Sequence, residues 1–215
     1  MVERVAARLQ IIRDRIAAAG GSDVRVLAVT KTFSVDEVLA AITAGCDGVG
    51  ESYAQEARAK LAAFQRNFEV HFIGQLQSNK IRSLVGVVDV FESVDRLSVI
   101  NELAKRAPGA QVLVQILPPD ATNAKGGCAL CDAPALVDGA RAAGLAVDGL
   151  MTVGPTVGGA EAAREGFRAV RSLADRLGLA TVSMGMTNDL EVAVQEGSTQ
   201  VRVGSALFGD RPRRG

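Results

Sequence analysis

The chain has 215 residues, which is long enough to bury a large core and short for two full domains. Hydrophobic residues make up 48% of the chain and charged residues 22%, a globular balance that argues against disorder. Lys plus Arg and Asp plus Glu number 24 each, so the formal charge of zero provides no general attraction to nucleic acid or to anionic membranes. We therefore expect neither as a partner.

The N-terminal segment does not have the pattern of a targeting sequence. Its first 20 residues mix charges into a helical pattern and lack the apolar core of a signal peptide. No apolar run reaches the roughly 20 residues that span a bilayer. The three cysteines are an odd number and suggest no disulfide framework. We expect a protein of the reducing cytoplasm.

The first predicted element is an amphipathic helix, because its apolar residues recur at three- and four-residue steps: Val2, Val5, Leu9, Ile12 and Ile16. Gly20 and Gly21 are expected to end it. Residues 24–30, VRVLAVT, are β-branched and nearly all apolar, which is typical of a strand buried on both faces. Ser34 and Glu37 have capping-box spacing and predict a helix over residues 35–44.

The alternation of strand and helix continues to the end of the chain. A second strand is predicted to end at residue 50, and others cover residues 69–74, 87–92, 111–117, 146–151, 180–185 and 199–204. The predicted helices between them cover about residues 52–64, 78–84, 96–106, 133–143, 159–177 and 190–196. Residues 118–132 are expected to form a long loop.

This order predicts an α/β protein with a parallel sheet. Eight strands in about 200 residues fit a closed (β/α)8 TIM-type barrel, with the first helix packed outside it as an extra N-terminal helix. We expect residues 1–215 to form one domain. An open doubly wound sheet has the same periodicity and remains the alternative.

Polar residues are predicted to gather at the carboxyl ends of the strands, where the active sites of such barrels lie. Lys31 follows the first strand, Glu51 the second and Gln75 the third. Residues 183–188 end the seventh strand and residues 202–205 the eighth. Polar groups from several strand ends at one mouth form a candidate site.

Lys31 comes directly after an apolar strand, so its amine is expected at the rim of a low-dielectric pocket. Burial disfavours the ammonium form of a lysine. A neutral amine can attack an aldehyde and form an imine. Position alone also allows a lysine that extends into solvent.

Two segments are candidates for binding phosphate. Asn188 and Glu191 have capping-box spacing, which predicts a helix start after the seventh strand, and residues 203–208 lead from the eighth strand into a short helix. Free N–H groups at a helix N-terminus attract phosphate, and these two loops are the usual phosphate site of such barrels. Ordinary helix capping would produce the same pattern.

Three further features bear on the candidate site. Arg202 lies within an apolar strand and needs a partner, which is either a ligand or a structural ion pair. Cys128 and Cys131 form a lone CxxC, and with only Cys46 and His71 besides, we expect no metal site. We expect His71 to be a hydrogen-bonded barrel residue and not a catalytic base.

Six motifs resemble the YggS/PROSC family of pyridoxal phosphate homeostasis proteins, over nearly the whole chain. They are LAVTK (27–31), VGESYAQE (49–56), HFIGQLQSNK (71–80), GLMTVGP (149–155), SMGMTNDLEVAVQEGST (183–199) and VRVGSALFG (201–209). HFIGQLQSNK is long and highly specific. Ser52 departs from the pattern, since the family usually has Asn there, and Ser205 stands where it usually has Thr.

The resemblance implies a fold like the N-terminal barrel of alanine racemase, with pyridoxal 5′-phosphate (PLP) bound to Lys31 as an internal aldimine, a Schiff base. It implies that Arg202 faces the pyridine nitrogen and that Asn79 and Met151 line the pocket near the ring. The implied phosphate contacts come from Ser183, Met184, Gly185, Gly204 and Ser205.

An arginine cannot accept the proton of the ring nitrogen, so it weakens the electron sink on which PLP enzymes depend. The leading hypothesis is a monomeric PLP-binding protein with no catalytic residue, which buffers the cofactor or delivers it to apo-enzymes. The alternative is a PLP-dependent amino-acid racemase, for which Tyr53, the single tyrosine, is the candidate second acid/base. A cofactor-free Schiff-base aldolase is a third hypothesis.

Overall fold

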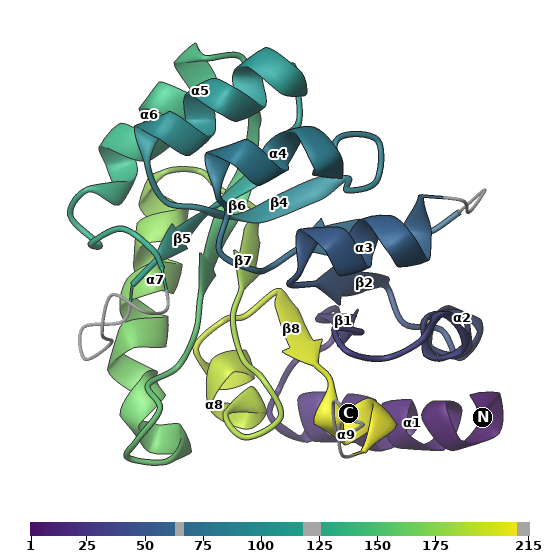
Figure 1. Ribbon diagram of the computed structural model, residues 1–215. Helices are drawn as coiled ribbons and strands as arrows, with labels where there is room; N and C mark the ends of the chain where they lie inside the picture. The colour runs from purple at the N-terminus through teal and green to yellow at the C-terminus, as the bar shows by residue number, and fades with distance from the viewer. Residues whose placement is uncertain (63–66, 118–125, 210–215) are drawn as a thin grey trace.

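Eight parallel strands form a closed barrel in the computed structural model, which describes residues 1–62, 67–117 and 126–209 (Figure 1). The strands are β1 (Arg25–Val29), β2 (Gly48–Glu51), β3 (Val70–Phe72), β4 (Val90–Val94), β5 (Gln111–Ile116), β6 (Ala146–Thr152), β7 (Thr181–Ser183) and β8 (Gln200–Val203). In β1, Leu27 lies opposite Gly48 of β2 on one side and opposite Arg202 of β8 on the other. This pairing closes the sheet, so the predicted barrel is confirmed and the open sheet is excluded.

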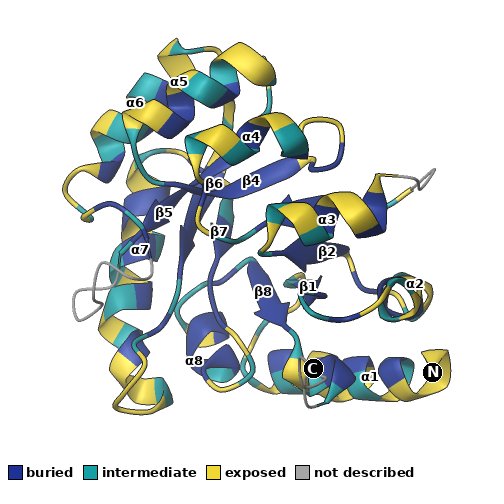
Figure 2. Ribbon diagram, in the orientation of Figure 1, coloured by how far each residue is buried: buried dark blue, intermediate teal, exposed yellow. Residues whose placement is uncertain are grey.

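Helices cover the outside of the barrel. They are α1 (Val2–Ala18), α2 (Val35–Thr43), α3 (Ala54–Leu61), α4 (Ser78–Leu84), α5 (Leu97–Arg106), α6 (Ala133–Ala142), the 3-10 helix η2 (Ala160–Ala163), α7 (Arg164–Arg176), α8 (Leu190–Gln195) and α9 (Ser205–Phe208). Figure 2 shows the strands buried and the helices exposed along their outer faces. The apolar faces of strands and helices therefore meet in one layer around the barrel.

The predicted N-terminal helix is confirmed as α1. Its buried residues are Val5, Leu9, Ile12 and Ile16, whereas Val2 in its first turn is exposed. The helix packs against α2, α8 and α9, outside the eight repeating units of the barrel. The helix ends at Ala18, and Gly20, just beyond its C-cap Ala19, has a φ of 95°, a left-handed conformation that favours glycine.

Several predicted boundaries are wrong by a few residues. The strand predicted at 87–92 is β4, Val90–Val94, because Val87 and Val88 lie in the turn after α4 and both donate hydrogen bonds to Leu84 O. Their burial makes this turn as apolar as a strand. Glu51 is the last residue of β2 and does not follow it.

The helical boundaries also differ from the predictions. The helix predicted at 159–177 is divided into η2 and α7. The capping box of Ser34 and Glu37 is confirmed, while the one predicted for Asn188 and Glu191 is wrong. Asp189 precedes α8, and the Glu191 carboxylate instead binds Arg15 of α1. Glu191 therefore binds a residue that is distant in the sequence and does not form the predicted capping box.

The barrel interior is apolar at some levels and polar at others. Val90, Leu113 and Met151, from three successive strands, pack together inside it. Gly48 and Gly50 leave room for Leu27, since a Cβ at either position would lie 3.2 or 3.1 Å from that side chain. The polar level contains Glu92, Ser183, Gln200 and Arg202, described below.

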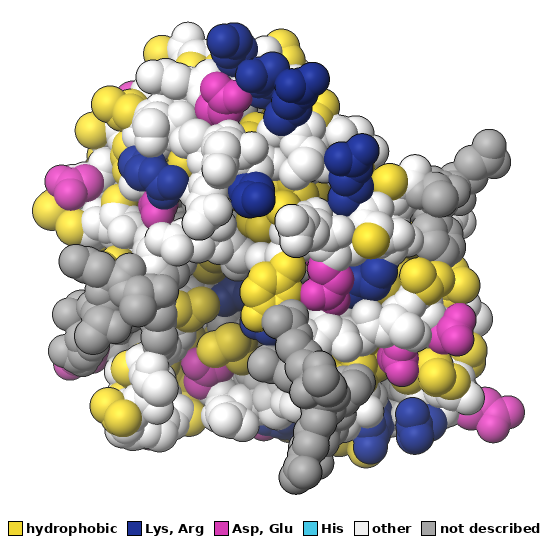
Figure 3. All heavy atoms as spheres, viewed as in Figure 1, with side chains coloured by type: hydrophobic (Ala, Val, Ile, Leu, Met, Phe, Trp, Pro, Cys, Tyr) yellow, Lys and Arg dark blue, Asp and Glu magenta, His cyan; other side chains and the backbone are white. Residues whose placement is uncertain are grey.

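No helix in the three described ranges is long and apolar enough to cross a membrane. The face of the molecule in Figure 3 carries both basic and acidic side chains, in keeping with the balanced charge of the chain.

Candidate cofactor site at the barrel mouth

Lys31 lies in the turn directly after β1 and is half-buried. The next residue, Thr32, has a φ of 69° and is the one non-glycine residue of the described ranges with a positive φ. This conformation costs a β-branched residue about 1–2 kcal/mol. The carboxylate of Glu56 accepts a hydrogen bond from Thr32 N–H and helps to hold the turn. The backbone at Lys31 is thus fixed by its surroundings.

A second lysine supports this turn from the outer side of the barrel. Lys60 Nζ donates to the main-chain oxygens of Thr30 (2.7 Å) and Phe33 (3.0 Å), the residues that flank the turn. It also lies 2.6 Å from the buried Glu51 carboxylate. Burial raises the pKa of Glu51, and the hydrogen bond and charge of Lys60 offset part of this rise. Lys60 was not identified from the sequence, where only its i,i+4 spacing from Glu56 hinted at a partner.

Arg202 is buried inside the barrel on β8. One terminal nitrogen donates to the carbonyl and to the hydroxyl of Ser183, both at 2.7 Å. The other donates to the carbonyl of Thr152 at 2.6 Å. The third donor, Nε, makes no hydrogen bond to any described residue. A ligand at the mouth could therefore accept from Nε.

The loops after β7 and β8 meet beside Arg202. Thr187 Oγ1 and Ser205 Oγ, one from each loop, lie 3.4 Å apart. Within the described chain, the N–H groups of Gly185, Gly204 and Ser205 donate no hydrogen bond. A Cβ at Gly204 would lie 3.2 Å from the carbonyl oxygen of Val29, so this loop also lies against the end of β1. The two loops offer main-chain and hydroxyl donors to an anion.

Ser183 and Met184, two residues expected to contact the phosphate, form hydrogen bonds with other groups of the barrel. The Ser183 hydroxyl is fully buried, donates to Glu92 and accepts from Arg202. Met184 donates its N–H to Gln200 O, and its carbonyl accepts from the hydroxyl of Ser198. Thr187 is a donor that the sequence argument did not single out, although it lies in the SMGMTND motif.

Asn79 and Met151, which the resemblance places together near the ring, lie in different parts of the structure. Asn79 is exposed on α4 and lines an outer groove with Arg58 and Arg82. Met151 is 1% exposed and packs with Val90 and Leu113 inside the barrel. It lies opposite Ser183 in the sheet, below the mouth.

The structure also places Tyr53 and the two cysteines of the CxxC motif. Tyr53, which precedes α3 and is 47% exposed, lines a rim cavity with Gln75 and Lys80. Cys128 is buried and Cys131 is exposed. Among the described residues, no group of three or more His, Cys, Asp and Glu side chains could hold a metal.

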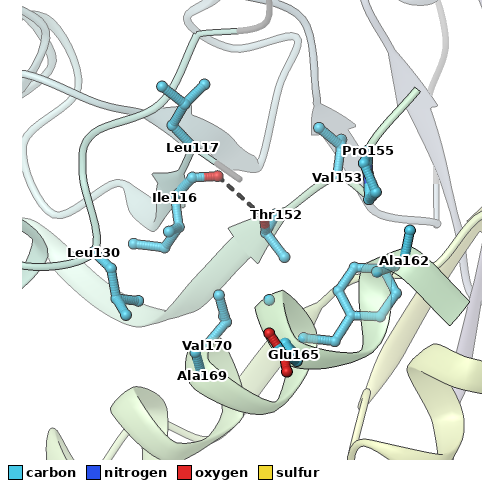
Figure 4. Close-up of a pocket in the computed structure, with 14 residues that line it drawn as sticks. Ile116, Leu117, Leu130, Thr152, Val153, Pro155, Ala162, Glu165, Ala169 and Val170 are labelled. Atoms are coloured by element: carbon cyan, nitrogen blue, oxygen red, sulfur yellow. Dashed lines mark hydrogen bonds between the residues drawn. The ribbon is translucent and has the colours of Figure 1, made fainter. Parts of the chain in front are cut away.

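A separate apolar cavity of about 250 Å³ lies between the ends of β5 and β6 and helix α7 (Figure 4). Ile116, Val153 and Val170 are among its walls. Thr152 also lines it, and the dashed line in Figure 4 marks the hydrogen bond from its hydroxyl to Ile116 O, 3.0 Å long. Because the carbonyl of Thr152 binds Arg202, this cavity shares a wall with the candidate site.

Comparisons with known proteins show the family and the fold. The family model of the alanine racemase N-terminal domain matches residues 2–212. The pyridoxal phosphate homeostasis protein of Pseudomonas aeruginosa is 39% identical over 222 residues, which cover 98% of this chain and 94% of that protein. The Escherichia coli protein of the same name is 35% identical over 227 residues, covering 96% and 97%.

Solved structures share the fold. PipY of Synechococcus elongatus with PLP bound matches with a TM-score of 0.80 and 28% identity, covering 95% of this chain and 100% of PipY. D-threo-3-hydroxyaspartate dehydratase from Delftia, at 21% identity and a TM-score of 0.74, shares the fold alone over 59% of its length. The chain belongs to the alanine racemase N-terminal domain family, among the pyridoxal phosphate homeostasis proteins.

Proposed function

We propose that this protein binds PLP at the barrel mouth and acts in PLP homeostasis in the cytoplasm, as a monomer that buffers the cofactor or delivers it to apo-enzymes. The observation that carries the proposal is the convergence of Lys31, Arg202 and two anion-binding loops from the adjacent strands β1, β7 and β8. In this proposal, residues 1–215 form a single PLP-binding domain. PipY, whose solved structure contains PLP, supports the cofactor assignment.

The donors of the site fit the cofactor. The N–H groups of Gly185, Gly204 and Ser205 are available for phosphate oxygens, with the hydroxyls of Thr187 and Ser205 beside them. The loop after β8 carries no acidic side chain between Gly204 and Gly209, and Asp189 of the loop after β7 accepts a hydrogen bond from Met186 N–H. Phosphate at this position would accept several charge-assisted hydrogen bonds.

Lys31 and Arg202 hold the rest of the molecule. Lys31 would hold the cofactor through its aldehyde group, and PLP bound there would supply Schiff-base chemistry toward amines. Arg202 would bind the ring nitrogen through Nε, because its terminal nitrogens are already bound to Ser183 and Thr152. Since a guanidinium only donates, the ring nitrogen stays unprotonated and the electron sink weak. Weak activation of bound amino acids suits storage and delivery.

The racemase alternative requires a second acid/base that faces the substrate. Tyr53 is the tyrosine available, and it lies in the rim cavity with Gln75 and Lys80. Conversion of an L-amino acid to its D-form that depends on both Lys31 and Tyr53 would establish the racemase instead.

The experiment that tests the proposal is a spectrum of purified protein with PLP, before and after borohydride. Wild type is expected to show the imine band, and reduction is expected to leave the cofactor mass on the peptide that contains Lys31. Lys31→Ala should lose both signals. Lys80→Ala removes a half-buried lysine of the rim and serves as the matched control that keeps them. An imine band that persists in Lys31→Ala would contradict the proposal.

A further inference from the structure

Glu92 is a fully buried carboxylate inside the barrel, with an exposed fraction of 0%. Its Oε1 accepts hydrogen bonds from His71 Nδ1 (2.6 Å) and Gln200 Nε2 (2.7 Å), and its Oε2 accepts one from Ser183 Oγ (2.6 Å). These partners come from β3, β8 and β7, so one side chain of β4 joins both halves of the barrel. The motifs of the sequence and the proposed function leave Glu92 without a role.

The contacts of Glu92 extend to Arg202 through one hydroxyl. An ionised carboxylate only accepts hydrogen bonds, so the single proton of Ser183 Oγ points at Glu92. The lone pairs of the same oxygen then face Arg202, which donates to it at 2.7 Å. Arg202 also lies 4.0 Å from Glu92 Oε2. The negative charge of Glu92 thus determines the direction of both hydrogen bonds, from Arg202 to Ser183 and from Ser183 to Glu92.

The charges of this cluster balance each other. Burial alone would raise the pKa of Glu92, but the hydrogen bond from His71 and the charges of His71 and Arg202 hold it below its usual value. Burial lowers the pKa of Arg202, and the charges of Glu92 and, to a smaller extent, Asp189 counter that effect. A buried guanidinium without a counter-charge is strongly disfavoured. Among the described residues, Glu92 is the one carboxylate within 4.0 Å of Arg202.

We propose that Glu92 is a positioning residue for the cofactor, which acts through Ser183 and Arg202 and holds Arg202 Nε toward the ring nitrogen. Glu92 itself does not touch the cofactor. The inference rests on the proposed function, because it requires PLP at the mouth. The inference adds the buried polar residues around Glu92 to those that determine how tightly the cofactor ring is held. These residues include His71, the single histidine of the chain.

The first test compares Glu92→Gln with Ser93→Ala. Ser93 is the next residue of β4, is also buried, and bonds Gly74 O outside the polar cluster, so it is a matched control for folding. Glu92→Gln is expected to weaken PLP binding about tenfold, as loss of a charge-assisted contact does, while Lys31 is still modified by PLP and borohydride. Ser93→Ala should bind as wild type does. Equal affinity of Glu92→Gln and Ser93→Ala would overturn the inference.

A double-mutant cycle separates positioning from general stability. If Glu92 acts through Arg202, adding Glu92→Gln to Arg202→Gln should cause no further loss of PLP affinity, whereas independent effects would multiply and contradict the inference. The third measurement uses folded wild type. The ring N–H resonance of His71, the single histidine, should move when PLP binds and stay unmoved in PLP-treated Arg202→Gln. If the His71 resonance of wild type does not move when PLP binds, the inference is overturned even if the variants do not fold.

The two proposals fail in different ways. Wild type that takes up no PLP would remove the proposed function itself. Wild type that binds PLP normally, with Glu92→Gln indistinguishable from it, would remove only the role of Glu92.

Discussion

Arg15 of α1 donates a hydrogen bond to the main-chain carbonyl of Thr187, 2.9 Å long, in the loop between β7 and α8. The same guanidinium binds the Glu191 carboxylate through bonds of 2.6 and 2.9 Å. Arg8, also on α1, donates to the carbonyl of Leu207 in α9 at 3.1 Å. The extra N-terminal helix therefore holds both segments that we propose to bind phosphate.

Removal of the Arg15 side chain should loosen the Thr187 loop. We expect Arg15→Ala to weaken PLP binding about fivefold, which corresponds to about 1 kcal/mol, the usual worth of a hydrogen bond that orders such a loop. A fluorescence titration of PLP binding measures this. Arg13→Ala is the matched control, since Arg13 lies on the same helix and bonds Gly45 O at 2.7 Å, outside the phosphate loops. Equal affinities of the two variants would show that α1 does not order the site.

Replacement of Lys60 should destabilise the fold. Lys60→Met leaves the Glu51 carboxylate buried without its partner, and such a loss costs about 3–5 kcal/mol in the free energy of unfolding. The loss should increase as the pH rises, because a carboxyl whose folded-state pKa is raised reduces stability once it ionises. Adding Glu51→Gln should recover most of the loss. Urea denaturation of the three proteins checks this, and a loss below about 1 kcal/mol in Lys60→Met would contradict the ion pair.

Glu92 should make the fold sensitive to acid. Its pKa is lower in the folded protein than in the unfolded chain, so the stability that it contributes is present above the unfolded value of about 4.3 and is lost as the pH falls through the folded value. Glu92→Gln cannot titrate at this position. The difference in unfolding free energy between wild type and Glu92→Gln should therefore shrink as the pH falls below about 4. A difference that is constant with pH would mean that folding does not lower the pKa of Glu92.

The three cysteines should differ in reactivity. Burial raises the pKa of Cys46 to about 12 and that of Cys128 to about 12, so both thiols stay protonated at neutral pH. Cys131 is exposed. We expect one thiol to react with an alkylating reagent in the folded protein and three to react in denaturant. Peptide mapping should place the fast reaction at Cys131, and rapid labelling of Cys46 would contradict its burial.

The sequence predicted the order and type of the elements well because those signals are local. The spacing of Val5, Leu9, Ile12 and Ile16 determines one face of α1, and alternating apolar strands and helices imply a parallel sheet. Boundaries were less accurate where burial made a turn apolar, as at Val87 and Val88. The candidate cap at Asn188 was wrong because α8 begins one residue later, after Asp189, and because Glu191 binds Arg15, which is distant in sequence.

For the site, the sequence by itself determined the positions of Lys31, Gly185, Gly204 and Ser205, since each follows a strand and carboxyl ends of barrel strands share one mouth. Only the tertiary structure decided which donors are available there. Ser183 and Glu92 are 91 residues apart in the chain, yet their hydrogen bond removes the Ser183 hydroxyl from the mouth. Closure of the barrel brings such residues together, and no local pattern encodes which of them meet in its interior.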